Sequence, residues 1–127
     1  IARIRQDLDE ALKLLNRALR IKPSALIFLE KGNVFLDRRQ FEAAEESLRQ
    51  SIAMYHSIPA AHFNLGITLK EQNRMPEAAA CFRRVIELDR QFPQADQNLR
   101  DCLSGNSGQA GVGAESTAAI PPPPSPQ

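Results

Sequence analysis

The amino-acid sequence repeats itself at a constant interval, the one from Gly32 to Gly66, and no other feature constrains the fold of this chain as strongly. We call this interval the repeat period. The other positions that it links carry similar residues: Phe41 and Met75, Ala44 and Ala78, Leu48 and Phe82, Ile52 and Ile86, Met54 and Leu88. A partial earlier copy at nearly the same interval contains Ala11, Leu15, Leu19 and Ile21. Pro59 and Pro93 are also one period apart, so we expect a further copy to open at Pro93 and to stop after one helix. A period of this length predicts similar units that stack along one axis.

Within each copy, apolar and small residues recur three or four positions apart, which is the spacing of one helix face. Ser24 is suited to cap a helix that begins near Ala25, and prolines stand where the first turn of a helix tolerates them. Short polar turns at 38–40 and 72–74 leave room only for antiparallel neighbours. The sequence therefore predicts helices over about residues 8–21, 25–38, 41–55, 59–72, 75–88 and 93–103.

Two glycines lie inside predicted helices at the same phase of the repeat. Gly32 and Gly66 each cost about 1 kcal/mol of helix stability relative to alanine. A cost repeated in register indicates that a neighbouring helix crosses too closely there for a Cβ atom. Ala44 and Ala78 are expected to serve the same close approach on the partner helices, with bulky residues filling the space between pairs.

The composition excludes several classes of function. Sixteen Lys and Arg residues stand against fifteen Asp and Glu and are dispersed, so no basic patch indicates nucleic acid or an anionic membrane as partner. No apolar run approaches the roughly 18 residues needed to cross a bilayer, so we expect no membrane insertion. Cys81 and Cys102 fit neither a disulfide framework nor a zinc site, and we interpret both as small packing residues. The sequence identifies no compartment, although a cytoplasmic location is favoured.

The residues that carry the repeat resemble a known family. The matching residues are the stretch from Ala61 to Gly66, then Leu69, Met75 to Ala78, Phe82, Val85, Ile86 and Leu88. Together they resemble the pattern of the tetratricopeptide repeat family. The stretch from Phe28 to Met54 resembles the family too, and Asp9 to Pro23 resembles the second helix of one more repeat. His62 departs from the family's large aromatic residue, and His56 and Arg90 depart from its closing proline.

The resemblance implies an all-α fold, a right-handed superhelical stack of antiparallel helix pairs that ends in a capping helix. It covers residues 1–103 and divides them into a partial repeat (1–24), two full repeats (25–58 and 59–92) and the capping helix (93–103). Residues 104–127 are rich in Gly, Ser, Ala and Pro and contain a single charge, Glu115. Such a segment buries too little apolar surface to offset its ordering entropy, so we predict a disordered tail with an extended stretch from Pro121 to Pro124.

No set of residues for catalysis or cofactor binding is recognisable. The glycines of the tail precede no helix and therefore do not form a phosphate-binding loop. His56 and His62 lie near one turn, and no nucleophile stands at a meaningful spacing from either. We interpret them as a turn residue and a replacement for an aromatic residue. We therefore expect a protein that is not an enzyme and binds neither a metal nor a cofactor.

A partner-binding surface is the remaining possibility, since the resemblance implies that the first helix of each pair lines the concave side of the stack. From the phase of the two glycines, the residues expected to bind a partner there are Leu29, Glu30, Asn33, Phe63, Asn64, Ile67, Asn98 and Asp101. Asn64 and Asn98 are one repeat period apart, so we expect their side chains to stack one above the other. Side-chain amides both donate and accept, and such a ladder can hold an extended peptide by its backbone. The alternative is that asparagine is only a common solvated residue at these positions.

The best-known ligand of the family is the C-terminal carboxylate of heat-shock chaperones, which is gripped by lysines, an arginine and asparagines. Asn33 and Asn64 match the two asparagines of that clamp. The positions of its cations are occupied by Leu29, Gln94 and Asn98. Because asparagines cannot neutralise a pair of carboxylates, we reject the clamp for this chain.

Two functions remain open at this point. The first is a protein-interaction scaffold or assembly factor that binds a protein or peptide partner in the groove, as part of a larger complex or a longer chain. The second is the recognition domain of a larger enzyme, such as a transferase, whose catalytic part lies outside this chain. A third possibility is that a helix from a missing part of the same chain, rather than a partner, covers the groove.

Overall fold

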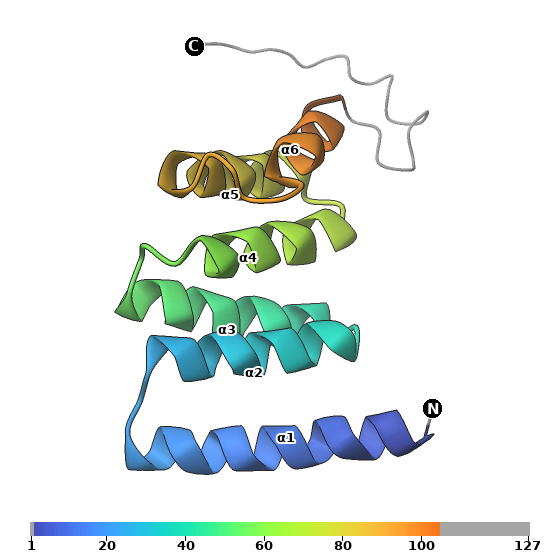
Figure 1. The fold of residues 1–127 in the computed structure, drawn as a ribbon. Coiled ribbons are helices and arrows are strands. Elements are labelled where there is room, and N and C mark those ends of the chain that lie inside the picture. Colours follow the sequence, from blue (N-terminus) through green and yellow to red (C-terminus); the bar gives the residue numbers. More distant parts are fainter. Residues whose placement is uncertain (1, 105–127) are drawn as a thin grey trace.

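The computed structural model describes residues 2–104, with side chains from Asp7 onward. Six α-helices and no β-strand occur in this range, and they form a single stack (Figure 1). The helices are α1 (Ala2–Ile21), α2 (Ala25–Asp37), α3 (Phe41–Met54), α4 (Pro59–Glu71), α5 (Met75–Leu88) and α6 (Ala95–Ser104). Each helix packs on the next one in the chain, and α2 also contacts α4 directly. The predicted all-α stack is confirmed.

The observed helix ends confirm the predicted ones to within two residues, with one exception. α1 begins at Ala2 rather than near residue 8, because residues 2–7 contain neither Gly nor Pro that would stop a helix. α6 begins at Ala95 and not at Pro93, because Gln94 has a φ of 67°. Ser104 belongs to α6 and not to the predicted tail, whose remaining residues lie outside the described range.

Local signals explain where the helices start and turn. Ser24 caps α2 as predicted, since its side-chain oxygen accepts a bond from Leu26 N at 3.2 Å. Arg39 and Asn73 follow α2 and α4 at equivalent positions of the repeat, and both have positive φ, 60° and 62°. The backbone bonds that close these two turns run from Gln40 N to Phe35 O (2.8 Å) and from Arg74 N to Leu69 O (2.9 Å). The repeat therefore extends to the backbone geometry of the turns.

The core lies between the two helices of each pair, where large buried side chains pack against the glycines. A Cβ atom on Gly32 would lie 2.7 Å from Leu48, and one on Gly66 would lie 2.8 Å from the ring of Phe82. The close approach predicted at both glycines is thus confirmed, but the atoms that cause it belong to a large side chain. Leu48 and Phe82 are fully buried. Each glycine therefore makes the space that the large residue of the next helix fills.

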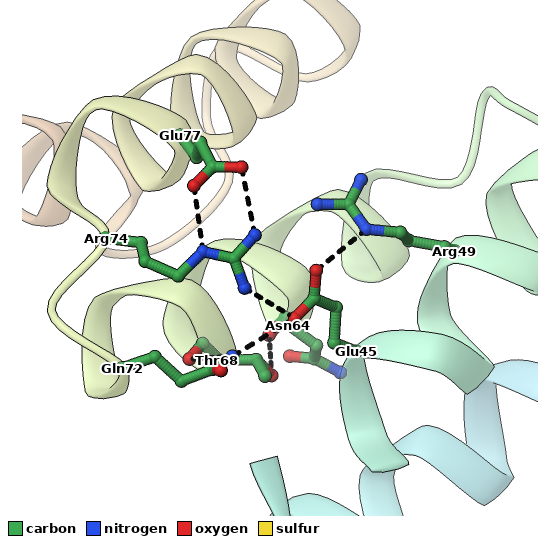
Figure 2. A network of polar contacts seen from close by, with 7 residues as sticks. All are labelled: Glu45, Arg49, Asn64, Thr68, Gln72, Arg74 and Glu77. Carbon is green, nitrogen blue, oxygen red and sulfur yellow. Dashed lines mark hydrogen bonds and ion pairs between the residues drawn. The ribbon is translucent and has the colours of Figure 1, made fainter. Parts of the chain in front are cut away.

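A polar network joins the first full repeat to the second (Figure 2). Glu45 on α3 accepts hydrogen bonds from Arg74 (2.7 Å), Arg49 (3.0 Å) and Gln72 (3.3 Å). Arg74 also binds both carboxylate oxygens of Glu77, at 2.8 and 3.0 Å. Burial raises the pKa of Glu45, but the hydrogen bonds from its three partners outweigh it, so the pKa lies below its usual value.

His62 is buried and takes the place of an aromatic residue, as predicted. Its Nε2 lies 2.8 Å from the backbone oxygen of His56, so the imidazole fixes the loop between α3 and α4. Since a carbonyl oxygen only accepts, this contact requires the proton on Nε2.

Candidate partner-binding face

Polar side chains from α2, α4 and α6 meet on one face of the stack. We call this surface the amide face and define it by Asn33, Asn64, Lys70, Asn98 and Asp101. Its hydrogen bonds join α2 to α4 and α4 to α6, which are the first helices of successive repeats. The direct contact between α2 and α4 brings the first two residues together.

Asn33 and Asn64 form a pair. Asn64 Nδ2 donates a hydrogen bond to Asn33 Oδ1, and both side chains are half-buried. The bond uses one polar atom of each amide. Within the described part of the chain, Asn33 Nδ2 and Asn64 Oδ1 make no further hydrogen bond. If both amides were turned over, the pair would still be left with one donor and one acceptor, so the conclusion does not depend on the orientation of the amides.

The second cluster is built around a lysine. Lys70 Nζ donates to Asn98 Oδ1 at 2.9 Å and lies 3.4 Å from Asp101 Oδ2. Asn98 is only 9% exposed, and its Nδ2 donates to the backbone oxygen of Gln94 at 3.0 Å. Both polar atoms of its amide are therefore hydrogen-bonded within the protein. The hydrogen bond from Gln97 and the charge of Lys70 hold the pKa of Asp101 below its usual value.

The contacts correct the expected ladder of asparagines. Asn64 bonds to Asn33 and not to Asn98, because side chains of neighbouring first helices meet at a sequence separation of 31, which is shorter than the repeat period. The pair of Lys70 and Asp101 has the same separation of 31. The strip predicted along the first helices included Lys70, but its contacts with Asn98 and Asp101 were not predicted, and this shared separation is the signal that could have identified the contact with Asp101.

One apolar residue predicted to face a partner is buried in the core, and a second packs partly against other aromatic rings. Leu29 is 6% exposed and belongs to the core, so its expected place on the free surface is wrong. Phe63 is half-buried, and its ring centroid lies 4.9 Å from that of Phe92 and 5.6 Å from that of Phe82. Phe92 stands in the loop before α6 and was not identified from the sequence.

The last two predicted residues are each one helical turn from an asparagine of the pair. Glu30 is exposed on α2, one turn before Asn33. Ile67 on α4 is half-buried and packs against the core. Of the eight predicted residues, Asn33 and Asn64 are therefore brought together directly, and Asn98 and Asp101 through Lys70.

Other kinds of site have no support in the described residues. Among them, no three His, Cys, Asp or Glu side chains come together in a way that could hold a metal ion. No helix of the described range is both long and apolar enough to cross a bilayer. Burial raises the pKa of the Cys81 thiol to about 11, and burial also raises the pKa of Cys102, so both thiols stay protonated at neutral pH.

Comparison with known proteins identifies the family. A family model described as tetratricopeptide repeat matches residues 29–96, which is more than half of the chain. The human protein "Tetratricopeptide repeat protein 13" is 24% identical over 92 residues, covering 72% of this chain and 11% of that protein. The chain therefore corresponds to a small part of this relative.

Solved structures share the fold at low sequence identity. The TPR domain of Arabidopsis OM64 has a TM-score of 0.74 and 20% identity, covering 80% of this chain and 85% of that domain. The first TPR of Spaghetti (RPAP3), solved with an HSP90 peptide, has a TM-score of 0.75 and 20% identity, covering 78% of this chain and 79% of that one. From the family model, the repeated glycine contacts and the stack of helix pairs, we conclude that the chain belongs to the tetratricopeptide repeat family.

Proposed function

We propose that this protein is a non-catalytic interaction scaffold and that its amide face binds an extended segment of a partner protein through the partner's backbone. The proposal rests on the pair of Asn33 and Asn64, which has one donor and one acceptor left over. In an extended chain the N–H and C=O groups of one residue point to the same side, whereas those of one trans peptide unit point in opposite directions. The pair can therefore bond the N–H and C=O groups of one residue of an extended chain without regard to its side chain.

The surroundings of the pair favour a segment with mixed side chains. Leu26 on α2 lies two turns before Asn33 and is 61% exposed, so it offers an apolar contact along the same helix. Glu30 lies between them and is exposed to solvent. An extended partner that follows α2 would meet an apolar, an acidic and an amide side chain in turn.

The proposed ligand is not a chaperone carboxylate, although a similar structure was solved with an HSP90 peptide. Leu29 stands at the position of a clamp cation and is buried in the core. Lys70 reaches Asn98, the position of the clamp arginine, but Asp101 already neutralises it. This leaves no free cation among the described residues of the amide face to pair with a carboxylate.

The experiment begins with a peptide selected from a random display library on the wild-type protein. Replacing Asn33 and Asn64 by Ala should weaken binding of that peptide by about 1–3 kcal/mol in calorimetry, since each lost hydrogen bond is worth about 0.5–1.5 kcal/mol. Gln50→Ala is the matched control, because Gln50 is an exposed amide on α3 and away from the face.

A second measurement separates backbone recognition from side-chain recognition. Methylating the peptide's backbone nitrogens one at a time should abolish the asparagine-dependent part of binding at one position. Changing the side chain at that position should have little effect. Unchanged affinity in the double asparagine variant would refute the proposed face.

A further inference from the structure

The free face of α2 carries two carboxylates, one on each side of Asn33. Glu30 lies three residues before Asn33 and Asp37 four residues after it, so all three side chains lie on one face of the helix. Glu30 and Asp37 are exposed. Within the described part of the chain, their carboxylates form no ion pair and no hydrogen bond. Both charges are therefore open to a ligand that binds at the asparagine pair.

The cations next to this face do not neutralise the two carboxylates. They pair with other acids: Arg38 with Asp9, Arg39 with Glu71, and Lys70 with Asp101. Lys31 follows Glu30 directly in α2 and is half-buried, so its side chain leaves the helix about 100° away from that of Glu30. The surroundings of the asparagine pair therefore keep two negative charges without a matching cation on the same face.

Helix stability does not explain the acid at Asp37. It is the last residue of α2, where the helix macrodipole is negative and an acidic side chain is unfavourable. Glu71 has the same position in α4, one repeat period later, but the guanidinium of Arg39 lies 3.3 Å from it. Asp37 has no such compensation within the described residues. Its charge adds to that of the helix end, and a cation from outside the chain would be stabilised there.

The spacing of the two carboxylates suits the side chains of an extended segment that follows α2. Glu30 and Asp37 are seven residues apart, which corresponds to about 10 Å along the helix axis. In an extended chain, the residues immediately before and after a given residue point to the same side and lie about 7 Å apart. The long and flexible side chain of a lysine or arginine at each of these positions spans the small difference.

We infer that the partner's segment is basic, with a lysine or arginine on each side of the residue whose backbone Asn33 and Asn64 bond. This chemistry rests on the proposed function, because it concerns the partner of the same face. The two basic side chains pair with Glu30 and Asp37, and the central residue contributes its N–H and C=O groups to the asparagine pair. The ligand is thus opposite in charge to the acidic peptide SRMEEVD, seen with the similar Spaghetti (RPAP3) domain.

The test uses peptides selected from a random display library on the wild-type protein. They should carry Lys or Arg on both sides of the residue at which backbone methylation weakens binding. Glu30→Gln and Asp37→Asn should each weaken binding of such a peptide about two- to fivefold in calorimetry, the usual effect of an exposed ion pair. Glu46→Gln is the matched control, since it removes the same charge from an exposed position of α3.

A charge exchange shows which basic residue of the peptide meets which carboxylate. Glu30→Lys should weaken binding more than Glu30→Gln, because it places two cations opposite each other. Replacing one flanking basic residue of the peptide by glutamate should then restore binding, and only at the position that faces residue 30. High salt should weaken binding to the wild-type protein and have less effect on the variant that lacks both carboxylates.

The proposed face and the proposed charge of its partner fail in different ways. If the double Asn33→Ala, Asn64→Ala variant loses affinity but Glu30→Gln and Asp37→Asn do not, the basic partner is refuted and the asparagine pair stands. Selected peptides with neutral or acidic residues on both sides of the central residue would refute the basic partner as well. If none of these variants loses affinity, the binding site lies elsewhere and both are refuted.

Discussion

Gly66 on α4 lies so close to Phe82 on α5 that a methyl group on its α-carbon would approach two ring carbons to 2.8 Å. In the preceding repeat, a methyl group on the α-carbon of Gly32 would come about as close to Leu48. A glycine costs about 1 kcal/mol inside a helix relative to alanine. The contact with the buried large residue must therefore be worth more than this cost in both repeats.

The first prediction concerns this contact. Gly66→Ala should lower the free energy of unfolding by about 1 kcal/mol, because overpacking costs about 1–3 kcal/mol and the gain in helix propensity offsets only part of it. Phe82→Leu made in the Gly66→Ala background should recover part of the loss by vacating the space. Urea melts of the two single variants and the double variant form a cycle, in which a coupling of about 1 kcal/mol is expected.

The matched comparison is Gly32→Ala. The side chain that obstructs it is Leu48, which can rotate, whereas the ring of Phe82 is rigid. We expect a smaller loss at Gly32 than at Gly66. A gain in stability at Gly66 would show that the close contact is not the reason for the glycine.

The second prediction is a pH dependence that originates at Glu45. Its pKa is lowered in the folded protein, so its ionised form stabilises the fold at pH values above its unfolded pKa. This stability should disappear as the pH falls from about 4.5 through the folded pKa, because the proton then displaces the bonds from Arg74 and Arg49. Glu45→Gln should therefore cost about 1 kcal/mol at pH 7 and progressively less below pH 4.5, measured by urea melts.

Glu87→Gln is the control for this series. Glu87 pairs with Arg84 at 3.0 Å, but its side chain is 64% exposed, so the pair contributes little. A loss for Glu45→Gln that is as large at pH 3 as at pH 7 would mean that packing rather than charge is responsible.

The third prediction concerns the turn after α4. Asn73 has a φ of 62°, a conformation that asparagine and glycine adopt and that β-branched residues avoid. Asn73→Val should lower stability by about 1–2 kcal/mol in thermal melts, whereas Asn73→Gly should be nearly neutral. Gln50→Val, on the exposed face of α3, measures the cost of valine where the backbone is helical. Equal losses at the two positions would contradict the role of the positive φ.

The sequence predicted the helices of this protein well because their limits depend on local chemistry. Ser24, the helix-starting prolines and the repeated glycines are each read from a few neighbouring residues. The repeat period then aligns equivalent positions and identifies which of them pack. The start of α1 was missed because no residue between 2 and 8 marks it.

The candidate site was predicted less well because it depends on how neighbouring repeats are rotated relative to each other. Equivalent residues are one repeat period apart, but Asn33 meets Asn64, and Lys70 meets Asp101, at the shorter separation of 31. That offset is set by the angle between first helices, which no local pattern encodes. Leu29 was misplaced as well, since it belongs to the core and is only 6% exposed.

The fourth prediction concerns the charge of Lys70. Its ammonium group lies 2.9 Å from Asn98 Oδ1 and 3.4 Å from Asp101 Oδ2, so its charge is largely neutralised within the protein. Asp101→Asn removes the carboxylate and keeps a side chain of the same shape. The lysine should then become available to an acidic ligand on the amide face.

The peptide SRMEEVD, seen with the similar Spaghetti (RPAP3) domain, is a suitable acidic probe. Asp101→Asn should bind it more tightly than the wild-type protein by about 0.5–1 kcal/mol, the usual worth of a partly exposed ion pair, in a fluorescence anisotropy titration. The gain should shrink at high salt, because the pair that produces it is partly exposed. Asp96→Asn is the matched control, since it removes the same charge from an exposed position of the same helix. Equal gains in both variants would indicate a general effect of net charge, and a gain that survives Lys70→Ala in the Asp101→Asn background would exclude the lysine as its source.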